Sequence, residues 1–148
     1  MIDSRIQTVA SFVREGSRVA DIGADHGYLS IELVRSGRAV QVIATEKNVE
    51  PFEVLRKNIL ASGLENFIDV RLGDGLQVLA AGEVDTICIA GMGGALMGKI
   101  LSDAPEVVQS ARRLILQPMN GAKKIRERLV EENWTIEDED LAEAASII

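Results

Sequence analysis

The chain has 148 residues, 47% of them hydrophobic and 26% charged, with a net charge of −7. This is the composition of one globular domain with a buried core, and no apolar run reaches the roughly 18 residues that a membrane span needs. The single cysteine, Cys88, excludes an internal disulfide and a multi-cysteine zinc site. Because the N-terminus also lacks the apolar segment of a signal peptide, a cytoplasmic protein is expected.

The negative charge is concentrated near the C-terminal end. Seven acids and no base lie in residues 131–143, and the rest of the chain carries equal numbers of acids and bases. A basic cluster precedes this segment, made of Arg112, Arg113, Lys123, Lys124, Arg126 and Arg128. The cluster fits either a solvated helix face or a surface that contacts phosphates.

Strand-like and helix-like apolar patterns alternate along the whole chain. Helices are predicted from Ser4 to a stop at Gly16, then over residues 28–36, 49–62, 94–100 and 121–132, with a short helix after Gly75. Strands are predicted over residues 18–23, 40–45, 68–72, 84–89 and 113–117, with a polar edge strand over 134–138. This alternation predicts an α/β fold with a mostly parallel, doubly wound sheet covered by helices on both faces.

Ligands of such sheets bind at the carboxyl ends of the strands, near the switch in strand order. The loop after the first strand, DIGADHG (residues 21–27), has two glycines that allow a sharp turn. A dinucleotide fingerprint needs glycine where Asp25 stands, and a carboxylate there repels a pyrophosphate. NAD and FAD are therefore disfavoured, and no Gly-Lys-Ser/Thr motif for a phosphate-binding loop occurs.

Four acids stand at or beside the predicted strand ends: Asp21, Asp25, Glu46 and Asp74. They suit a cationic ligand that is rich in hydroxyl and amino donors and has no phosphate, which describes S-adenosylmethionine. Glu46 lies 23 positions after Gly23, near the spacing expected for an acid that binds ribose hydroxyls. Asp74 is placed to accept from the adenine amine. A divalent metal bound by Asp21, Asp25 and Asp74 is the main alternative.

Several strings occur together in one order: SRIQTV (4–9), DIGADHGYL (21–29), GDGL (73–76), IAGMGG (89–94) and LILQP (114–118). In these strings the chain resembles the bacterial tRNA adenine N1-methyltransferases that modify position 22 of tRNA. The resemblance covers nearly the whole chain and implies a Rossmann-like class I methyltransferase domain over residues 1–148. S-adenosylmethionine is then the methyl donor, tRNA the partner, and neither a membrane nor a metal is expected.

The expected cofactor-binding residues combine the glycine loop, the acids and the resemblance: Arg5, Asp21, Gly23, Asp25, His26, Gly27, Tyr28, Glu46, Asp74, Gly75, Ala90, Gly91 and Met92. The expected substrate-binding residues are Gly93, Gln117, Asn120, Lys123, Lys124, Arg126 and Arg128. No catalytic residue is assigned.

Individual roles stay open at this stage. Arg5 is either a surface residue or a donor to a carboxylate or phosphate, and the glycines of residues 90–94 fit a tight helix entry as well as a contact with a flat base. Gln117 and Asn120 could pair with an adenine edge, although Asn120 could equally cap the next helix. His26 is either structural or part of the donor loop, and Tyr28 either stacks on a ligand or packs on the sheet.

The resemblance also has departures. Family members carry a further helical region after this domain, and the chain stops at AASII (144–148), where the last strand of the family should run. The expectation is a sheet whose last strand is missing, with self-association as a homodimer or a strand-swapped assembly through the incomplete edge. Two alternative functions remain, a methyltransferase for a small molecule or a protein, and a non-catalytic remnant that binds S-adenosylmethionine.

Overall fold

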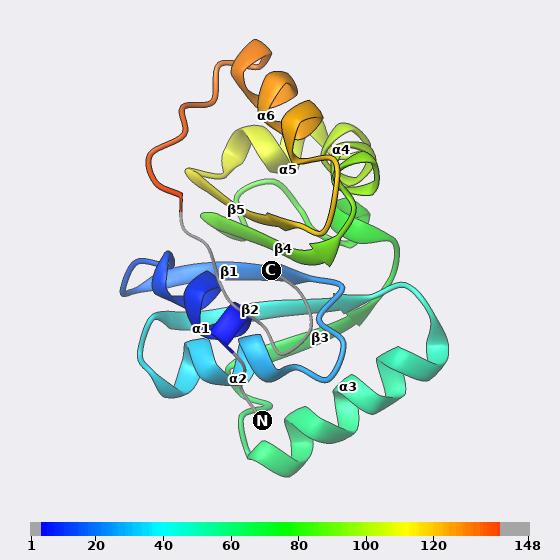
Figure 1. Ribbon diagram of the computed structural model, residues 1–148. Coiled ribbons are helices and arrows are strands. Elements are labelled where there is room, and N and C mark those ends of the chain that lie inside the picture. Colours follow the sequence, from blue (N-terminus) through cyan, green and yellow to red (C-terminus); the bar gives the residue numbers. More distant parts are fainter. Residues whose placement is uncertain (1–3, 140–148) are drawn as a thin grey trace.

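The computed structural model describes residues 4–139, which form a five-stranded sheet with helices on both faces (Figure 1). The elements in chain order are α1 (Ser4–Ser11), β1 (Ser17–Ile22), α2 (Tyr28–Arg35), β2 (Ala39–Glu46), α3 (Val49–Ser62), β3 (Ile68–Leu72), the 3₁₀ helix η1 (Gly75–Val78), β4 (Thr86–Met92), α4 (Gly94–Ser102), α5 (Pro105–Ser110), β5 (Arg113–Pro118) and α6 (Ala122–Glu131). The strand order is β3-β2-β1-β4-β5 and every pair is parallel. The predicted doubly wound α/β fold is confirmed.

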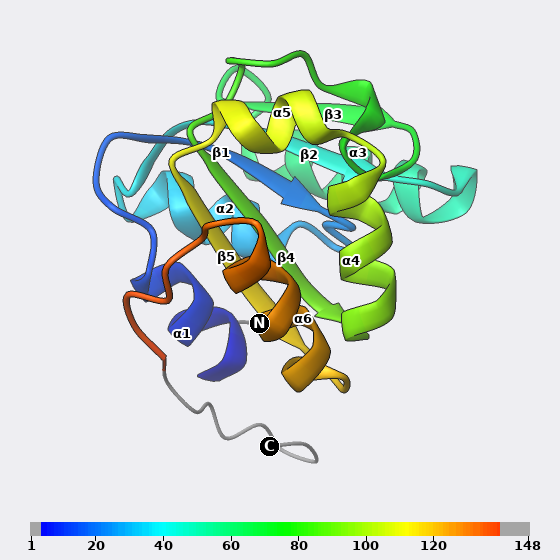
Figure 2. The same ribbon diagram turned by 90° about the horizontal axis from the view of Figure 1, so that it is seen from above.

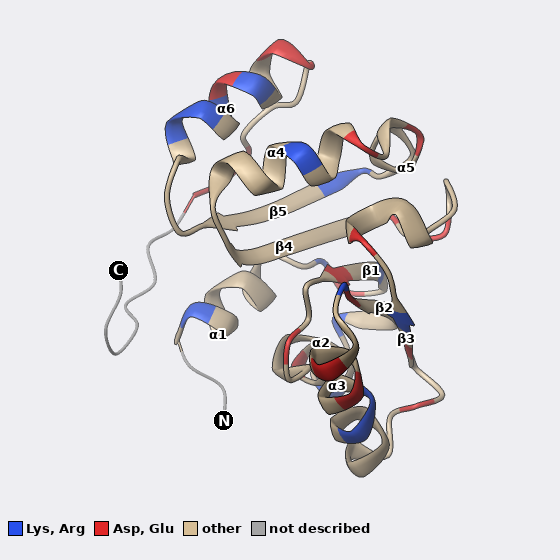
Figure 3. Cartoon of the chain, turned by 90° about the vertical axis from the view of Figure 1, so that its right-hand side faces the viewer, with Lys and Arg blue, Asp and Glu red and all other residues tan. Residues whose placement is uncertain are grey.

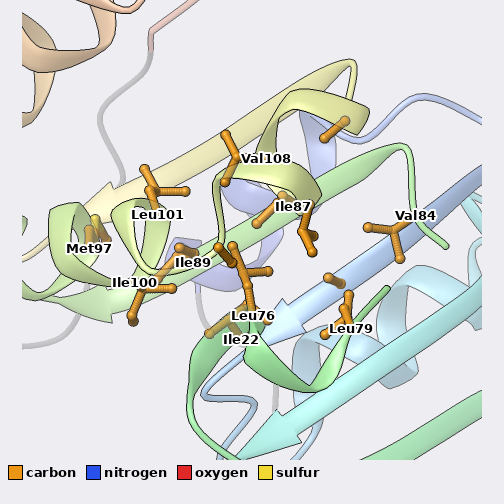
Figure 4. Close-up of a cluster of buried hydrophobic side chains, with 14 of the residues drawn as sticks. Ile22, Leu76, Leu79, Val84, Ile87, Ile89, Met97, Ile100, Leu101 and Val108 are labelled. Atoms are coloured by element: carbon orange, nitrogen blue, oxygen red, sulfur yellow. The ribbon is translucent and has the colours of Figure 1, made fainter. Parts of the chain in front are cut away.

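Apolar side chains cover both faces of the sheet, as a parallel sheet between helices requires. On one face, Ile22, Ile87 and Ile89 pack with Leu76 of η1 and Met97 of α4 in a cluster that extends to α5 and α6 (Figure 4). On the other face, strand residues pack against α1, α2 and α3 in a second cluster. The two layers hold the sheet between them, so the carboxyl ends of its strands are fixed relative to one another.

The chain changes direction across the sheet between β1 and β4. From β1 it proceeds outward through β2 to β3, and it then returns to place β4 on the other side of β1. The carboxyl ends of β1 and β4 are therefore the switch point, which is where open α/β sheets bind their ligands.

The structure departs from the predicted elements in three places. The first helix ends at Ser11 and not near Gly16, because Phe12 and Val13 donate to carbonyls three residues back in tighter turns. Residues Pro105–Ser110 form α5, which was not predicted. Its six residues are too few to show a helical period.

The predicted edge strand over 134–138 is wrong. After α6 the chain has no regular secondary structure up to Glu139, and it runs past β5 towards α1 (Figure 2). The Trp134 N–H donates back to the Leu129 carbonyl at 2.8 Å, and Glu137 pairs with Arg113 at 2.8 Å. Ion pairs, rather than a hydrogen-bonded ladder, hold this acidic segment.

Within the described residues β5 is an edge strand. A groove of about 400 Å³ runs along it, with α1 on one side and α6 on the other, and it is lined by apolar residues such as Phe12, Leu116, Ile125 and Leu129. Residues 144–148, where the last strand of the family was expected, lie outside the described part of the chain.

We predict that a polypeptide of this sequence self-associates through the β5 edge, since an unpaired strand offers main-chain donors and acceptors to another chain. The Arg113 and Met119 N–H groups donate towards the β4 side, so strand alternation places the Leu116 N–H at the open edge. Leu116→Pro removes that donor and should shift sedimentation profiles, recorded over a wide concentration range, towards monomer. A parent chain that remains monomeric throughout contradicts the prediction.

Candidate active site

The loop after β1 forms one wall of the candidate site. It turns through three residues in the left-handed region, Gly23 at φ 67°, Asp25 at φ 57° and Gly27 at φ 85°. The Ala24 N–H donates to the Thr45 carbonyl at 3.0 Å, which ties the loop to β2. Asp25 is not a glycine, so a surrounding contact must hold its backbone in this uncommon conformation.

That contact comes from Glu46, at the end of β2. Its Oε2 accepts the Asp25 N–H at 2.7 Å. A charged acceptor makes this a strong hydrogen bond, and it fixes the turn that the glycine loop makes above the sheet. Glu46 thus has a structural role that spacing did not reveal, and no described residue donates to its other carboxylate oxygen.

Asp21 does not lie in the cleft as predicted. The alternation of β1 turns its side chain below the loop, where it is 4% exposed and accepts a 2.6 Å hydrogen bond from the Ser30 hydroxyl of α2. Burial raises the pKa of Asp21 to about 6, the Ser30 hydrogen bond opposes this, and the negative charges of Glu46 and Asp25 add to it. Ser30 was missed, although a serine in the first turn of α2 is the polar group nearest to Asp21.

His26 and Tyr28 form an exposed stack beside the loop. Their ring centroids are 5.4 Å apart and their planes differ by 9°. His26 Nδ1 lies 3.2 Å from the Asp25 carboxylate, and the His26 carbonyl accepts from Asn58 of α3 at 3.0 Å. Asn58 was not predicted, since it is 32 residues away in sequence. The stack leaves an aromatic surface at the mouth of the site.

The third acid, Asp74, follows β3 at the same edge of the sheet. The Gly73 N–H donates to the Glu46 carbonyl at 2.8 Å, which places this loop next to the end of β2, and Lys47 Nζ lies 3.9 Å from Asp74 Oδ2. Gly75 is buried with its Cα against Ile100 of α4, so it has a packing role. The acids at the cleft are therefore Asp25, Glu46 and Asp74.

The irregular end of β4 and the glycines that follow it, residues 91–94 and here called the glycine turn, form the opposite wall. The register with β5 shifts between Ala90 and Met92, which leaves Gly91 outside the ladder at φ 78°. The Met92 methyl group packs directly on Gly23, and the Gly94 N–H donates to the Asn120 carbonyl at 2.8 Å. The glycine turn therefore contacts both the loop after β1 and the β5–α6 connection.

Gln117 and Arg5 meet behind this turn. The Gln117 Oε1 accepts the Gly91 N–H at 2.9 Å and Arg5 Nη1 at 3.2 Å. Arg5 therefore lies on the β5 side, beside Gly91, rather than at the loop after β1. The sequence held no signal for this contact, because Arg5 and Gln117 are 112 positions apart.

Asn120 does not cap α6, which was one of the two roles left open for it. The N-cap position of α6 is Gly121, and no side chain caps the helix. The Asn120 Oδ1 instead lies 2.8 Å from the point where a Cβ on Gly93 would stand, so it packs on the glycine turn.

The basic residues of α6 divide into two groups. Arg126 pairs with Glu139, and Arg128 contacts the Ser102 hydroxyl and lies 3.5 Å from Glu132. Lys123 and Lys124 are exposed in the first turn, where Figure 3 shows basic residues on the outside of the helix. This turn begins one residue after Gly121, whose carbonyl touches Gly94, so the two lysines flank the glycine turn.

Two further properties of residues 4–139 bear on the predictions. No three His, Cys, Asp or Glu side chains among them are grouped to hold a metal ion, so Asp21, Asp25 and Asp74 do not converge. In the same part of the chain, no helix combines the length and apolar character that crossing a bilayer requires.

The buried Asp21 predicts a pH-dependent stability. Its folded pKa of about 6 exceeds the unfolded value of about 3.9, so ionisation disfavours the folded state as pH rises through this window. The cost grows from near zero below pH 4 to on the order of 3 kcal/mol above pH 7. Asn at this position still accepts from Ser30 and does not ionise.

Asp21→Asn should therefore gain stability relative to the parent between pH 4.5 and pH 8, by about 2 kcal/mol. Urea denaturation of both proteins at the two pH values measures the difference, and groups common to both cancel. An unchanged difference between parent and variant across this range would show that Asp21 does not titrate in it.

Comparison with known proteins identifies the family. A family described as "Methyltransferase domain" matches residues 2–148. The tRNA (adenine(22)-N(1))-methyltransferase of Bacillus subtilis is 43% identical over 142 residues, covering 96% of this chain and 60% of its own length.

Two solved structures share the fold closely. A B. subtilis m1A22 tRNA methyltransferase has a TM-score of 0.92 at 40% identity, covering 99% of this chain and 63% of its own. Streptococcus pneumoniae Sp1610 in complex with S-adenosyl-L-methionine has a TM-score of 0.95 at 40% identity, covering 99% and 69%. The chain spans about 60% of the curated B. subtilis relative, and over nearly all of its own length it belongs to the methyltransferase domain family.

Proposed function

We propose that this chain is an S-adenosylmethionine-dependent methyltransferase that methylates N1 of an adenine in tRNA. One observation carries the proposal. At the switch point, an acid-rich glycine loop after β1 lies against the glycine turn at the end of β4, and the two are in contact through Met92. The relative that is 43% identical has this activity in its name, and a structural neighbour was crystallised with this donor.

The residues of the first wall fit the donor chemically. S-adenosylmethionine carries positive sulfonium and ammonium groups and hydroxyl and amine donors, but no phosphate. The site offers Asp25, the second oxygen of Glu46, and Asp74, all acceptors or negative charges at one sheet edge. A dinucleotide would bring its pyrophosphate to Asp25, which is exposed and negative. The same residues therefore favour the sulfonium donor over NAD.

The residues of the second wall fit a flat base. Gly91 and Gly93 present main chain without side chains, and the Asn120 side chain lies against Gly93. Bound S-adenosylmethionine supplies a methyl group on a positively charged sulfur, which the lone pair of adenine N1 takes as the carbon–sulfur bond breaks. Neutral adenine has no proton on N1, so the protein needs no general base. Its task is to hold the turn and the loop at a fixed distance and exclude misaligned approaches.

The positive charge moves from sulfur to the adenine ring during this transfer. Carboxylates of the loop wall lower the energy of a positive charge nearby. The Glu46 carboxylate is fixed to the loop by the Asp25 N–H, so it does not need to reorganise as the charge moves.

Contact with tRNA is assigned to the first turn of α6. Lys123 and Lys124 are exposed, and their helix starts against the glycine turn. A base drawn out of a folded RNA keeps its backbone within a few bonds, so phosphates pass close to the entrance of the site. Ammonium groups there bind them without reading sequence.

The decisive test incubates the protein with labelled S-adenosylmethionine and unmodified tRNA transcripts, then locates the methyl group. The proposal expects N1-methyladenine at position 22 and no product from a transcript with guanine there. Transfer to small molecules or proteins but not to tRNA would support a different methyltransferase. Donor binding without transfer to any acceptor would support a non-catalytic remnant.

We predict that Glu46→Ala and Asp74→Ala each weaken donor binding by about 1–3 kcal/mol, the cost of losing a hydrogen bond to a charged group. Calorimetry with S-adenosylhomocysteine measures the effect. Glu50→Ala, an exposed acid in the first turn of α3, is the matched control and should bind as the parent does. Unchanged affinity in both site variants would remove these two acids from the donor site.

We predict that reversing Lys123 and Lys124 together to Glu abolishes tRNA methylation and leaves donor affinity intact. Neither lysine touches the donor loop, and each lost phosphate contact should flatten the salt dependence of tRNA binding by about one unit of slope. Reversing Arg126 and Arg128 to Glu in the otherwise unchanged chain should have less effect, because acids and Ser102 already engage these arginines.

The matched control for the charge reversal is Arg35→Glu with Lys57→Glu, two exposed cations on α2 and α3, on the other face of the sheet. It changes net charge by the same amount and should preserve tRNA methylation. If the α6 variant methylates tRNA as well as this control does, the lysines form only a solvated helix face.

A further inference from the structure

Gln117 occupies a position where two donors converge on one atom. The Gly91 N–H and Arg5 Nη1 lie 2.9 Å and 3.2 Å from its side-chain Oε1. Both are obligate donors, so the amide must present its oxygen to them. Its nitrogen is left facing Met119 Sδ at 3.6 Å, a weak acceptor. The Gln117 side chain is therefore bound to the rest of the protein mainly through its oxygen.

The main-chain amide that Gln117 holds is that of Gly91, the residue that falls outside the β4–β5 ladder. On the two sides of Gly91, Ala90 pairs with β5, and the Met92 carbonyl accepts the Met119 N–H at 2.8 Å. Gly91 itself falls in the register shift, where a side chain has replaced the strand as its acceptor. Without that side chain, rotation of the Ala90–Gly91 peptide would leave its neighbours bonded as before.

The direction of this peptide matters for the site. A trans peptide points its carbonyl opposite to its N–H. Because the Gly91 N–H points to the Gln117 side chain, the Ala90 carbonyl points away from Gln117 and Arg5. Arg5 Nη1 also lies 2.9 Å from where a Cβ on Gly91 would stand, so the guanidinium and the amide close this peptide in from behind.

We propose that Gln117 is a positioning residue, whose side-chain oxygen holds the Gly91 N–H and Arg5 and thereby fixes the orientation of the Ala90–Gly91 peptide in the wall of the methyl-transfer site. This inference rests on the proposed function and gives Gln117 a role different from a direct contact with adenine. The turn stays folded without it, because main-chain bonds hold Met92 and Gly94, but it loses the alignment on which transfer depends.

Two substitutions separate the roles. Gln117→Glu keeps an acceptor oxygen for Gly91 and Arg5 and removes the Nε2 donor, whereas Gln117→Ala removes both. We expect Gln117→Ala to lower kcat about tenfold to a hundredfold, with KM for tRNA and affinity for S-adenosylhomocysteine unchanged. Gln117→Glu should keep the kcat of the parent at saturating tRNA, and Gln109→Ala, an exposed glutamine of α5, should behave as the parent.

Equal losses of kcat in Gln117→Ala and Gln117→Glu would overturn the inference in favour of a substrate contact through Nε2. Full activity in Gln117→Ala would overturn it outright.

A second measurement does not depend on methylation. Exchange of the Gly91 amide hydrogen, followed by NMR, should be slow in the parent and in Gln117→Glu and at least about tenfold faster in Gln117→Ala, the equivalent of one lost hydrogen bond. Equal exchange in all three would also refute the positioning role. If the parent transfers no methyl to tRNA, the proposed function fails, and this exchange still decides whether Gln117 holds the turn.

Discussion

The candidate site depends on the register shift at the end of β4. One residue, Gly91, falls out of the ladder with β5, and the chain turns there at φ 78°. This turn brings the Met92 methyl group onto Gly23 and Gly94 against Gly121. The loop after β1, the glycine turn and the start of α6 therefore meet through glycines and one methionine methyl group. Any added Cβ at these contacts would force the walls apart, which explains why the turn contains so little side-chain chemistry.

The parallel sheet was predictable because its strands are buried on both faces. Such strands appear in the sequence as short continuous apolar runs. The five strands of the sheet and most of their helices were predicted from that pattern. The predicted edge strand after α6 was wrong. Residues 134–138 were predicted as a strand, but Glu137 there pairs with Arg113 and Arg14, and an ion pair leaves no periodic pattern in the sequence.

The site was predictable only in part. Glycines at 23, 27 and 91 mark backbone conformations that other residues avoid, so their loops could be located from sequence. Asp21 was misplaced because a strand points alternate side chains to opposite faces, and proximity to the loop in sequence did not decide which face. The Arg5–Gln117 contact joins α1 to β5, and no spacing rule reaches across 112 positions.

Opposite charges lie on the two sides of the site. On the loop side, burial raises the pKa of Asp21 to about 6, and the negative charges of Glu46 and Asp25 add to this effect. On the α6 side, Lys123 and Lys124 stand exposed. In the proposed reaction a cationic donor is attracted to the first side and an anionic tRNA to the second, so neither ligand competes for the other's place. Transfer leaves the sulfur neutral, which weakens its attraction to the acids, and the same field that collects the donor therefore favours release of the spent product.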